Sequence, residues 1–275
     1  MKRANLWRRC TAALVVLCMS ISLCVPVLAE SGTVPEPEPH VYDVGRGSIC
    51  VDGTQVTQNG VTCEDDAPII TGEGSGTALE IVAYSGTTRV TLRDLHITNT
   101  NSGGGGAVKI EGGTNCTVEL VLEGTNVLKS ENGDGAGILH NRDTGAACLL
   151  VLDGTGSLEA TGVGRGAGIG AATRGYAGGS VTIKGGTITV VGGDSAAGIG
   201  GADGVGSSPI LINDGHVTVV GGLNRAALGS GRDDDSGHSN CCIYGGEVTL
   251  IRRGGNGRWI DGLETGALAG NVTLK

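Results

Sequence analysis

The sequence predicts an all-β protein, and within that class a right-handed parallel β-helix (β-solenoid) with about 30 residues and three short strands per coil. Pairs of alternating apolar runs, each pair separated by a glycine-containing turn, repeat along the chain. No window sustains an apolar stripe at helical spacing. Short segments such as AGI recur with spacings of 29 to 31 residues, at Ala78, Ala107, Ala136, Ala167, Ala197 and Ala227.

Two strands of each coil are predicted from the alternating runs, which are rich in Val, Ile and Thr and are bounded by GG, DG or GT. The third strand is expected at the AGI segment. A unit of about 30 residues cannot bury its own inward face, so we expect stacked units to share one core. The runs are VELVLEGTNVLKS from Val118, LLVLDGTGSLEA from Leu149, VTIKGGTITVV from Val181, PILINDGHVTVV from Pro209 and CCIYGGEVTLI from Cys241.

The alternation also predicts which side chains face the shared interior. Residues between two inward positions, such as Thr182, Lys184 and Thr189, are expected to face solvent. Glycine is expected at the corners, where positive φ angles and close stacking leave no room for a side chain. The inward positions of three successive coils are Val181, Ile183, Ile188 and Val190, then Ile210, Ile212, Val217 and Val219, then Cys241, Ile243, Val248 and Leu250.

The N-terminal segment predicts export. In residues 1–29, basic residues precede the apolar run AALVVLCMSISLCVPVLA, which ends on small residues, a pattern typical of a cleavable signal peptide. A single membrane anchor is the alternative interpretation. Residues 30–46 are rich in Pro and Glu and predict an extended spacer. Residues 47–275 are expected to form one β-helix domain. Within it, residues 254–275 are a candidate C-terminal cap; the alternative is that the chain is a fragment.

The charge balance excludes two classes of partner. The formal net charge is −9 at pH 7, and cleavage after Ala29 would remove four basic residues and no acidic one. An acidic chain repels nucleic-acid phosphates and anionic lipids. We therefore expect no nucleic-acid binding and no membrane insertion after signal cleavage. The chain is also expected to be a monomer.

Six cysteines remain beyond the predicted signal peptide. An even number in an exported chain allows up to three disulfides, and buried thiols that pack as small hydrophobic residues are the alternative. Cys241 and Cys242 are adjacent in a predicted strand and point to opposite faces, so we expect no bond between them. No His/Cys spacing is typical of a zinc site.

We predict no catalytic residue. The densest acidic group is Asp233, Asp234 and Asp235, followed by His238, in a predicted corner loop. A solvated turn is one interpretation, and Ca²⁺ coordination by these carboxylates is another. Parallel β-helices include pectin-degrading lyases and hydrolases. A polysaccharide lyase or glycoside hydrolase with an unfamiliar site in this loop is therefore the alternative to a non-catalytic protein.

Aromatic side chains are the usual platforms for sugar rings, and this chain has few of them. It contains no Phe and four Tyr. Tyr176, Tyr244 and Trp259 are the candidate carbohydrate-binding residues, because each is predicted to lie in a loop, on an outward position or near the C-terminal end. Packing within a loop or an end cap is the alternative role for each.

A ladder of threonines offers a second way to hold a long polysaccharide. Thr189, Thr218 and Thr249 occupy matching outward positions in successive coils. Regular threonine arrays on flat solenoids also order water in some ice-binding proteins, which is one alternative. The preference of threonine for β-strands is another.

The repeat pattern resembles a known group of proteins. Triplets of the GAGIG type alternating with VTIKGGTITVVGG, together with SICVDGTQVTQNG, VTLRDLHIT and LVLEGTNVL, are similar to exported Firmicutes proteins that carry a carbohydrate-binding β-helix domain, and to their adhesin-like surface proteins. The resemblance covers about residues 47–252. It implies binding of a polysaccharide or cell-surface glycan, of cellulose or pectin type and with Ca²⁺ assistance, and a secreted or Gram-positive cell-surface location.

We therefore expect an exported, non-catalytic, polysaccharide-binding or adhesin-like β-helix protein. The first alternative is the pectin-active lyase or hydrolase named above. The second is a structural spacer within a larger surface protein.

Overall fold

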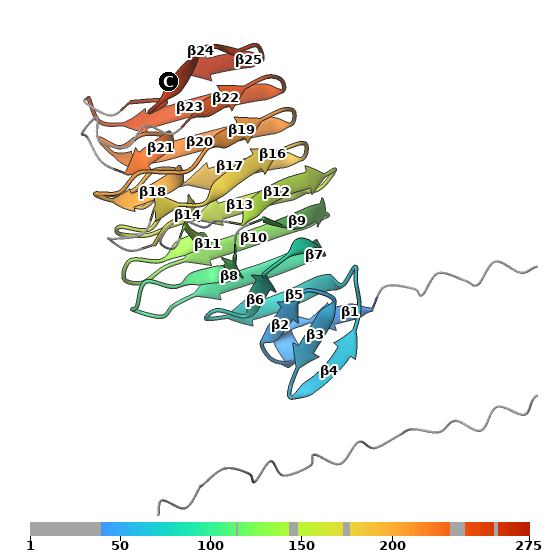
Figure 1. Ribbon diagram of the computed structural model, residues 1–275. Helices are drawn as coiled ribbons and strands as arrows, with labels where there is room; N and C mark the ends of the chain where they lie inside the picture. The colour runs from blue at the N-terminus through green and yellow to red at the C-terminus, as the bar shows by residue number, and fades with distance from the viewer. Residues whose placement is uncertain (1–39, 114, 143–147, 173–176, 232–239, 256–257) are drawn as a thin grey trace, which may run out of the picture. The chain divides into compact units, whose positions relative to one another are not determined.

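The computed structural model describes residues 40–113, 115–142, 148–172, 177–231, 240–255 and 258–275 (Figure 1). The chain divides into two units, Met1–Pro37 and Glu38–Lys275. The first unit contains the predicted signal peptide and part of the predicted spacer, and it lies outside the described residues. In the part of the chain that is described, no helix has the length and apolar character needed to cross a membrane.

The second unit is a parallel β-solenoid of about six turns, which confirms the predicted fold class. Strands that are neighbours in a sheet come from segments about 30 residues apart, and Figure 1 shows them stacked one above another from β6 to β25. One column of buried side chains follows this stacking through six consecutive coils: Leu79, Val108, Ile138, Ile169, Ile199 and Leu228.

A 15-stranded sheet forms two of the three faces of the solenoid. The first face contains β9 (Cys116–Glu123), β12 (Leu149–Gly154), β16 (Ser180–Ile183), β19 (Ile210–Ile212), β22 (Cys241–Ile243) and β24 (Leu263–Leu268). The second face contains β10 (Thr125–Ser130), β13 (Ser157–Thr161), β17 (Thr187–Val191), β20 (His216–Leu223), β23 (Glu247–Arg253) and β25 (Asn271–Leu274).

The long strand β7 (Gly86–Asn99) belongs to both of these faces. Its residues 86–93 pair with β9, and its residues 96–99 pair with β10. Asp94, with φ of 49°, turns the corner between the two parts, and its carboxylate accepts a hydrogen bond of 2.9 Å from the backbone N–H of Thr125 in the next coil.

A ten-stranded sheet forms the third face, and its parallel strands include the AGI segments. These strands are β2 (Ile49–Asp52), β6 (Leu79–Ala83), β8 (Gly106–Gly112), β11 (Ala136–Arg142), β14 (Ile169–Gly170), β18 (Ile199–Asp203) and β21 (Leu228–Gly231). The short strand β15 (Ala177–Gly178) pairs with β11 in the antiparallel sense.

The N-terminal end of the stack departs from the repeat. Strands β3 (Gln55–Gln58) and β4 (Val61–Glu64) follow β2 as an antiparallel meander. Strand β1 (Val41–Asp43) and the 3₁₀ turn η1 (Val44–Arg46) precede β2 in the chain. Strand β1 pairs with β5 (Ile69–Ser75). At the other end, in the segment predicted as a cap, β24 and β25 pair in parallel with β22 and β23 and extend the stack.

The inward positions predicted for the coils that begin at Val181, Pro209 and Cys241 are all buried, which confirms the register of alternation. One outward prediction is wrong. Thr182 is only 9 % exposed, because Val151 and Leu211 stand on either side of it in the neighbouring coils and shield a short side chain. Lys184 is exposed, as predicted, and Thr189 is half-buried. The structure contains no disulfide among the six cysteines.

Candidate functional site

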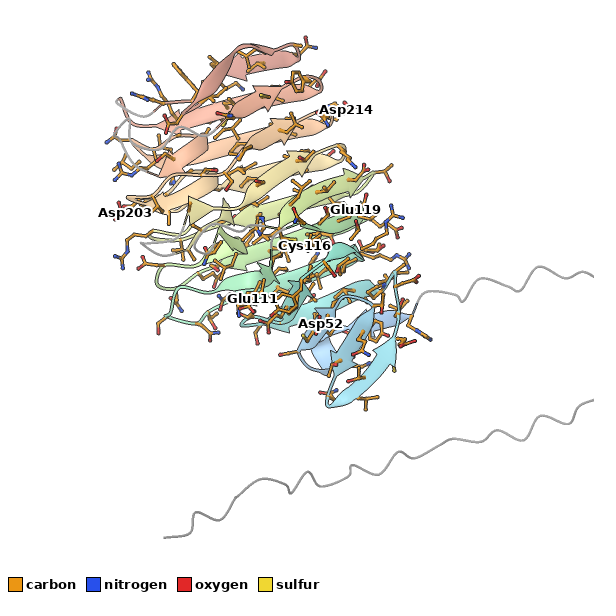
Figure 2. The ribbon with its side chains drawn as sticks, in the orientation of Figure 1. Asp52, Glu111, Cys116, Glu119, Asp203 and Asp214 are labelled. Atoms are coloured by element: carbon orange, nitrogen blue, oxygen red, sulfur yellow. The ribbon has the colours of Figure 1, made fainter. Side chains whose placement is uncertain are left out.

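A cleft of about 330 Å³ lies on the third face, at outward positions of β8 and β11 and at the turn after β6. Its lining comes from three consecutive coils. Their register sets Glu80 beside Lys109, and Lys109 beside Leu139. Figure 2 labels Glu111 in this part of the solenoid, among the strands β6 and β8. The side chains and backbone that line the cleft include Tyr84, Lys109, Glu111, Gly112, Leu139 and Asn141.

Tyr84 is the aromatic member of the cleft. It stands in the turn between β6 and β7 and is 67 % exposed. The next coil approaches this turn at Gly113, whose N–H donates a 3.0 Å hydrogen bond to the carbonyl of Ala83. A Cβ at Gly113 would lie 3.4 Å from the Tyr84 carbonyl oxygen and 3.9 Å from its ring. The coil thus packs against the base of the tyrosine, at ordinary contact distance, while the ring remains open to solvent.

Lys109 is the cationic member, and two carboxylates hold it. Its ammonium donates a 2.8 Å hydrogen bond to Glu80 and also pairs with Glu111. These contacts, that of Glu111 first and that of Glu80 second, raise the pKa of Lys109 above its ordinary value. The lysine therefore stays protonated at neutral pH. One ammonium between two carboxylates leaves this group with a formal charge of −1.

Asn141 and Leu139 complete the cleft on β11. Leu139 is 6 % exposed and packs on Ala136 and Ala172, so it provides a fixed apolar surface. The side-chain oxygen of Asn141 is shielded from solvent and has no hydrogen-bond partner among the described residues. A shielded acceptor of this kind is stabilised by a donor, either a water molecule or a hydroxyl group of a bound molecule.

This combination is suited to binding a polyhydroxylated molecule. An exposed aromatic ring offers a flat apolar face, and the carboxylate, ammonium and amide groups offer hydrogen-bond acceptors and donors. Its volume is at the lower end of the range found for small-molecule sites. The described residues include no group of three or more His, Cys, Asp or Glu side chains placed to hold a metal ion.

Several residues predicted from the sequence lie outside the described residues. They are Tyr176 and the loop that contains Asp233, Asp234, Asp235 and His238. The predictions of sugar binding at Tyr176, and of Ca²⁺ coordination or catalysis in the acidic loop, therefore stay predictions.

The other two aromatic candidates do not line the cleft. Trp259 is partly buried against the core, its indole N–H donates a 2.9 Å hydrogen bond to the carbonyl of Lys275, and the guanidinium of Arg252 stands over its ring at 4.1 Å from the centroid. One face of this ring is thus already occupied. Tyr244 is 55 % exposed and follows β22, at a corner three coils or more from Tyr84 along the stack.

The threonine ladder is present on the second face. Thr189 pairs with Thr218, and Thr218 pairs with Thr249, in parallel register. Thr273 on β25 extends the column by one position, and the sequence pattern missed it because the last coil is shorter than 30 residues. The three predicted threonines are half-buried and Thr273 is exposed. This column lies on β17, β20, β23 and β25, whereas the cleft lies on the third face.

Tyr84, Lys109, Glu111 and Asn141 were missed as candidate residues when the sequence was considered alone. No local motif connects them, since they come from three coils. Alignment of the repeats does provide a signal. Ala83 pairs with Gly112, so Tyr84 stands beside Gly113 in the next coil, which also contains Glu111.

Together, these observations define a β-solenoid with an open cleft of mixed aromatic and polar lining on its outside. Comparison with known proteins adds nothing more specific: no protein-family model matches the chain, and no curated protein or solved structure matches it significantly.

Proposed function

We propose that this protein is an exported, non-catalytic polysaccharide-binding protein, and that the cleft at Tyr84 is its sugar-binding site. The single observation that carries the proposal is the 67 % exposed Tyr84 ring, which borders a cleft lined by Lys109, Glu111 and Asn141. The N-terminal sequence, typical of a signal peptide, supports export.

The chemistry of a pyranose ring fits this lining. Its axial C–H groups stack on an aromatic face, and its hydroxyl groups both donate and accept hydrogen bonds. The shielded oxygen of Asn141 needs a donor, and the Glu111 carboxylate accepts further hydrogen bonds. The lining residues stand at outward positions of a continuous sheet, so a longer chain can extend past the cleft over the neighbouring coils.

The state of Lys109 supports binding and argues against a lyase reaction in the cleft. A lyase needs a basic side chain that is neutral enough to remove a proton from the sugar. The pKa of Lys109 is raised by Glu111 and Glu80, so the amine holds its proton at neutral pH. In this state Lys109 orients the two carboxylates and donates hydrogen bonds.

The local charge favours a neutral polysaccharide over a polyuronate. Glu80, Lys109 and Glu111 together carry a formal charge of −1, and the whole chain carries −9. Both charges repel the carboxylates of pectin-type chains. We therefore propose a neutral β-linked glucan, of the cellulose type, as the class of ligand.

The test is binding of the full chain to insoluble cellulose, and calorimetric titration with soluble cello-oligosaccharides. Tyr84→Ala is expected to weaken binding roughly fivefold, because stacking on an aromatic ring contributes on the order of 1 kcal/mol. Polygalacturonate, with and without Ca²⁺, is expected to bind more weakly than the neutral chain.

Tyr244→Ala is the matched control, since Tyr244 is also an exposed tyrosine in a turn but does not line the cleft. Its affinity is expected to equal that of the unmodified chain. Failure of the unmodified chain to bind any neutral glucan would refute the proposed ligand. A loss of binding in Tyr244→Ala, with none in Tyr84→Ala, would refute the proposed site.

A further inference from the structure

Two cysteines from consecutive coils lie next to each other inside the solenoid. Cys116 begins β9, and Cys148 immediately precedes β12. The pairing of Thr117 with Leu149 places the two cysteines one step earlier in the same register. Both are buried, with exposed fractions of 4 % and 1 %. Figure 2 labels Cys116 in the stack of strands above Glu111.

The distance between neighbouring strands suits a disulfide. Adjacent strands lie about 4.8 Å apart. Disulfide-bonded cysteines have Cα atoms roughly 4.4 to 6.8 Å apart, so no large backbone movement is needed.

The surroundings of Gly112 show that both side chains converge on one point. A Cβ at Gly112 would lie 2.6 Å from the Cβ of Cys148 and 3.1 Å from the sulfur of Cys116. The Cys116 thiol also donates a 3.1 Å hydrogen bond to the carbonyl of Gly113. Glycine at position 112 therefore leaves the space in which the Cβ of Cys148 and the sulfur of Cys116 lie.

A catalytic role for this thiol pair has no chemical support. Burial, and then the Cys116 thiol beside it, raise the pKa of Cys148 to about 12. The buried His140 on β11, which lies between the two cysteines in the sequence, has its pKa lowered to about 4 by burial and is neutral at pH 7. A protonated thiol near a neutral imidazole is not an activated nucleophile.

We propose that Cys116 and Cys148 form a disulfide that joins two consecutive coils when the chain folds in an oxidising environment. The oxidant is a disulfide R–S–S–R, of a small molecule or of an exchange enzyme. One thiolate attacks it and releases the first R–SH, and the second cysteine then displaces the other R–SH. The two cysteine thiols lose two electrons and two protons to form one S–S bond. This inference does not depend on the proposed sugar binding.

The strand register places residues other than cysteine beside each of the remaining four cysteines. Cys241 has Ile210 and Leu263 as its neighbours in the adjacent coils, and Cys242 points to the opposite face. In the N-terminal meander, Cys50 pairs with Thr57 and Cys63 pairs with Val56. Because Val56 and Thr57 are consecutive in one strand, Cys50 and Cys63 point to opposite faces of the sheet. The structure therefore assigns one disulfide out of the three that the cysteine count allows.

The timing of the reaction follows from the burial of both sulfur atoms. Buried thiols react slowly, and the raised pKa of Cys148 slows its reaction further, so the bond is expected to form before the two coils close over it. Once formed, it is expected to resist reduction in the native protein.

Peptide mapping tests the assignment directly. The full chain is refolded with oxidised and reduced glutathione, alkylated with iodoacetamide in denaturant without reductant, and digested with trypsin. Cleavage after Lys109, Lys129, Arg142 and Arg165 yields peptides 110–129 and 143–165, each with one of the two cysteines. The expected result is a linked pair of these peptides that weighs two hydrogen masses less than their sum, with Cys50, Cys63, Cys241 and Cys242 alkylated.

Cys241→Ala is the matched control, because it removes another buried, inward cysteine and should leave the linked pair intact. Thermal unfolding provides a second measurement. Reductant present during refolding is expected to lower the Tm of the unmodified chain by about 5 to 10 °C, with no such effect on the Cys116→Ala/Cys148→Ala double variant. Alkylation of both cysteines after oxidative refolding, or a linked pair that involves another cysteine, would overturn the assignment.

Discussion

At the scale of single residues, the buried polar side chain of His140 departs from the aliphatic pattern of the repeat. His140 occupies an inward position that Ile81 and Ile110 occupy in the two preceding coils. Its ring lies 3.3 Å from the carbonyl of Ser180 and packs against Gly179, where a Cβ would be 2.2 Å from the imidazole. The glycine thus makes room for a larger, polar residue in an otherwise aliphatic column.

The burial of His140 predicts a pH dependence of stability. Its pKa falls from 6.5 to about 4 on folding, so the unfolded chain binds a proton first as the pH decreases. The contribution of neutral His140 to the free energy of unfolding is complete above about pH 6.5. It is lost progressively as the pH falls to about 4, and the total loss is about 3 kcal/mol. Urea denaturation between pH 4 and pH 8 measures it.

His140→Ile restores the residue that the preceding coils carry at this position, and it is expected to remove this part of the pH dependence. The exposed His96 and His216 remain in the variant, so the difference between the two curves isolates His140. Identical slopes for the variant and the unmodified chain below pH 6.5 would contradict the prediction.

At the scale of elements, the glycine that follows AGI has a specific role. Gly170 pairs with Gly200, and Gly200 pairs with Gly229, in one column on the third face. All three have φ angles between 118° and 136°. A Cβ on Gly200 would lie 2.0 Å from the backbone oxygen of Gly229. The glycine after AGI is therefore required by the close stacking of neighbouring backbones.

Gly200→Ala is expected to destabilise the protein by at least about 2 kcal/mol, because both its φ angle and the adjacent backbone reject a side chain. The control is Gly204→Ala, since Gly204 also has a positive φ but its Cβ would meet nothing within 4 Å. That variant is expected to cost only about 1 kcal/mol. Equal losses in chemical denaturation would show that crowding in the column is unimportant.

At the scale of the whole solenoid, each coil contacts mainly the coils before and after it. The ion pairs between coils illustrate this, since Arg89 pairs with Glu119, and Lys129 pairs with Glu159, one repeat further on. Each such exposed pair contributes little stability. The shared core provides most of it, as expected for a linear array of similar units.

Deletion of one complete repeat is therefore expected to leave a folded protein. Removal of residues 181–209 joins Ser180 to Ile210, and the residue at each inward position is replaced by its equivalent one coil later. Circular dichroism and size-exclusion chromatography are expected to show a β-rich monomer with a cooperative, less stable unfolding transition.

Deletion of residues 181–195 is the control, because it removes about half a repeat and brings strands of different faces into the same position. It is expected to prevent folding. If both deletions behaved alike, the coils would not be interchangeable units.

The sequence by itself determined the period, the three strands of each coil and the inward side chains, because these depend on local alternation and on turn residues that every coil repeats. It did not determine the cleft or the cysteine pair. Tyr84, Lys109 and Asn141 lie about 30 residues apart, and only the stacking of three coils brings them together. The burial of Thr182 was decided in the same way, by the size of its neighbours in adjacent coils. The alternation specifies which way a side chain points, whereas the register between coils decides what it meets there.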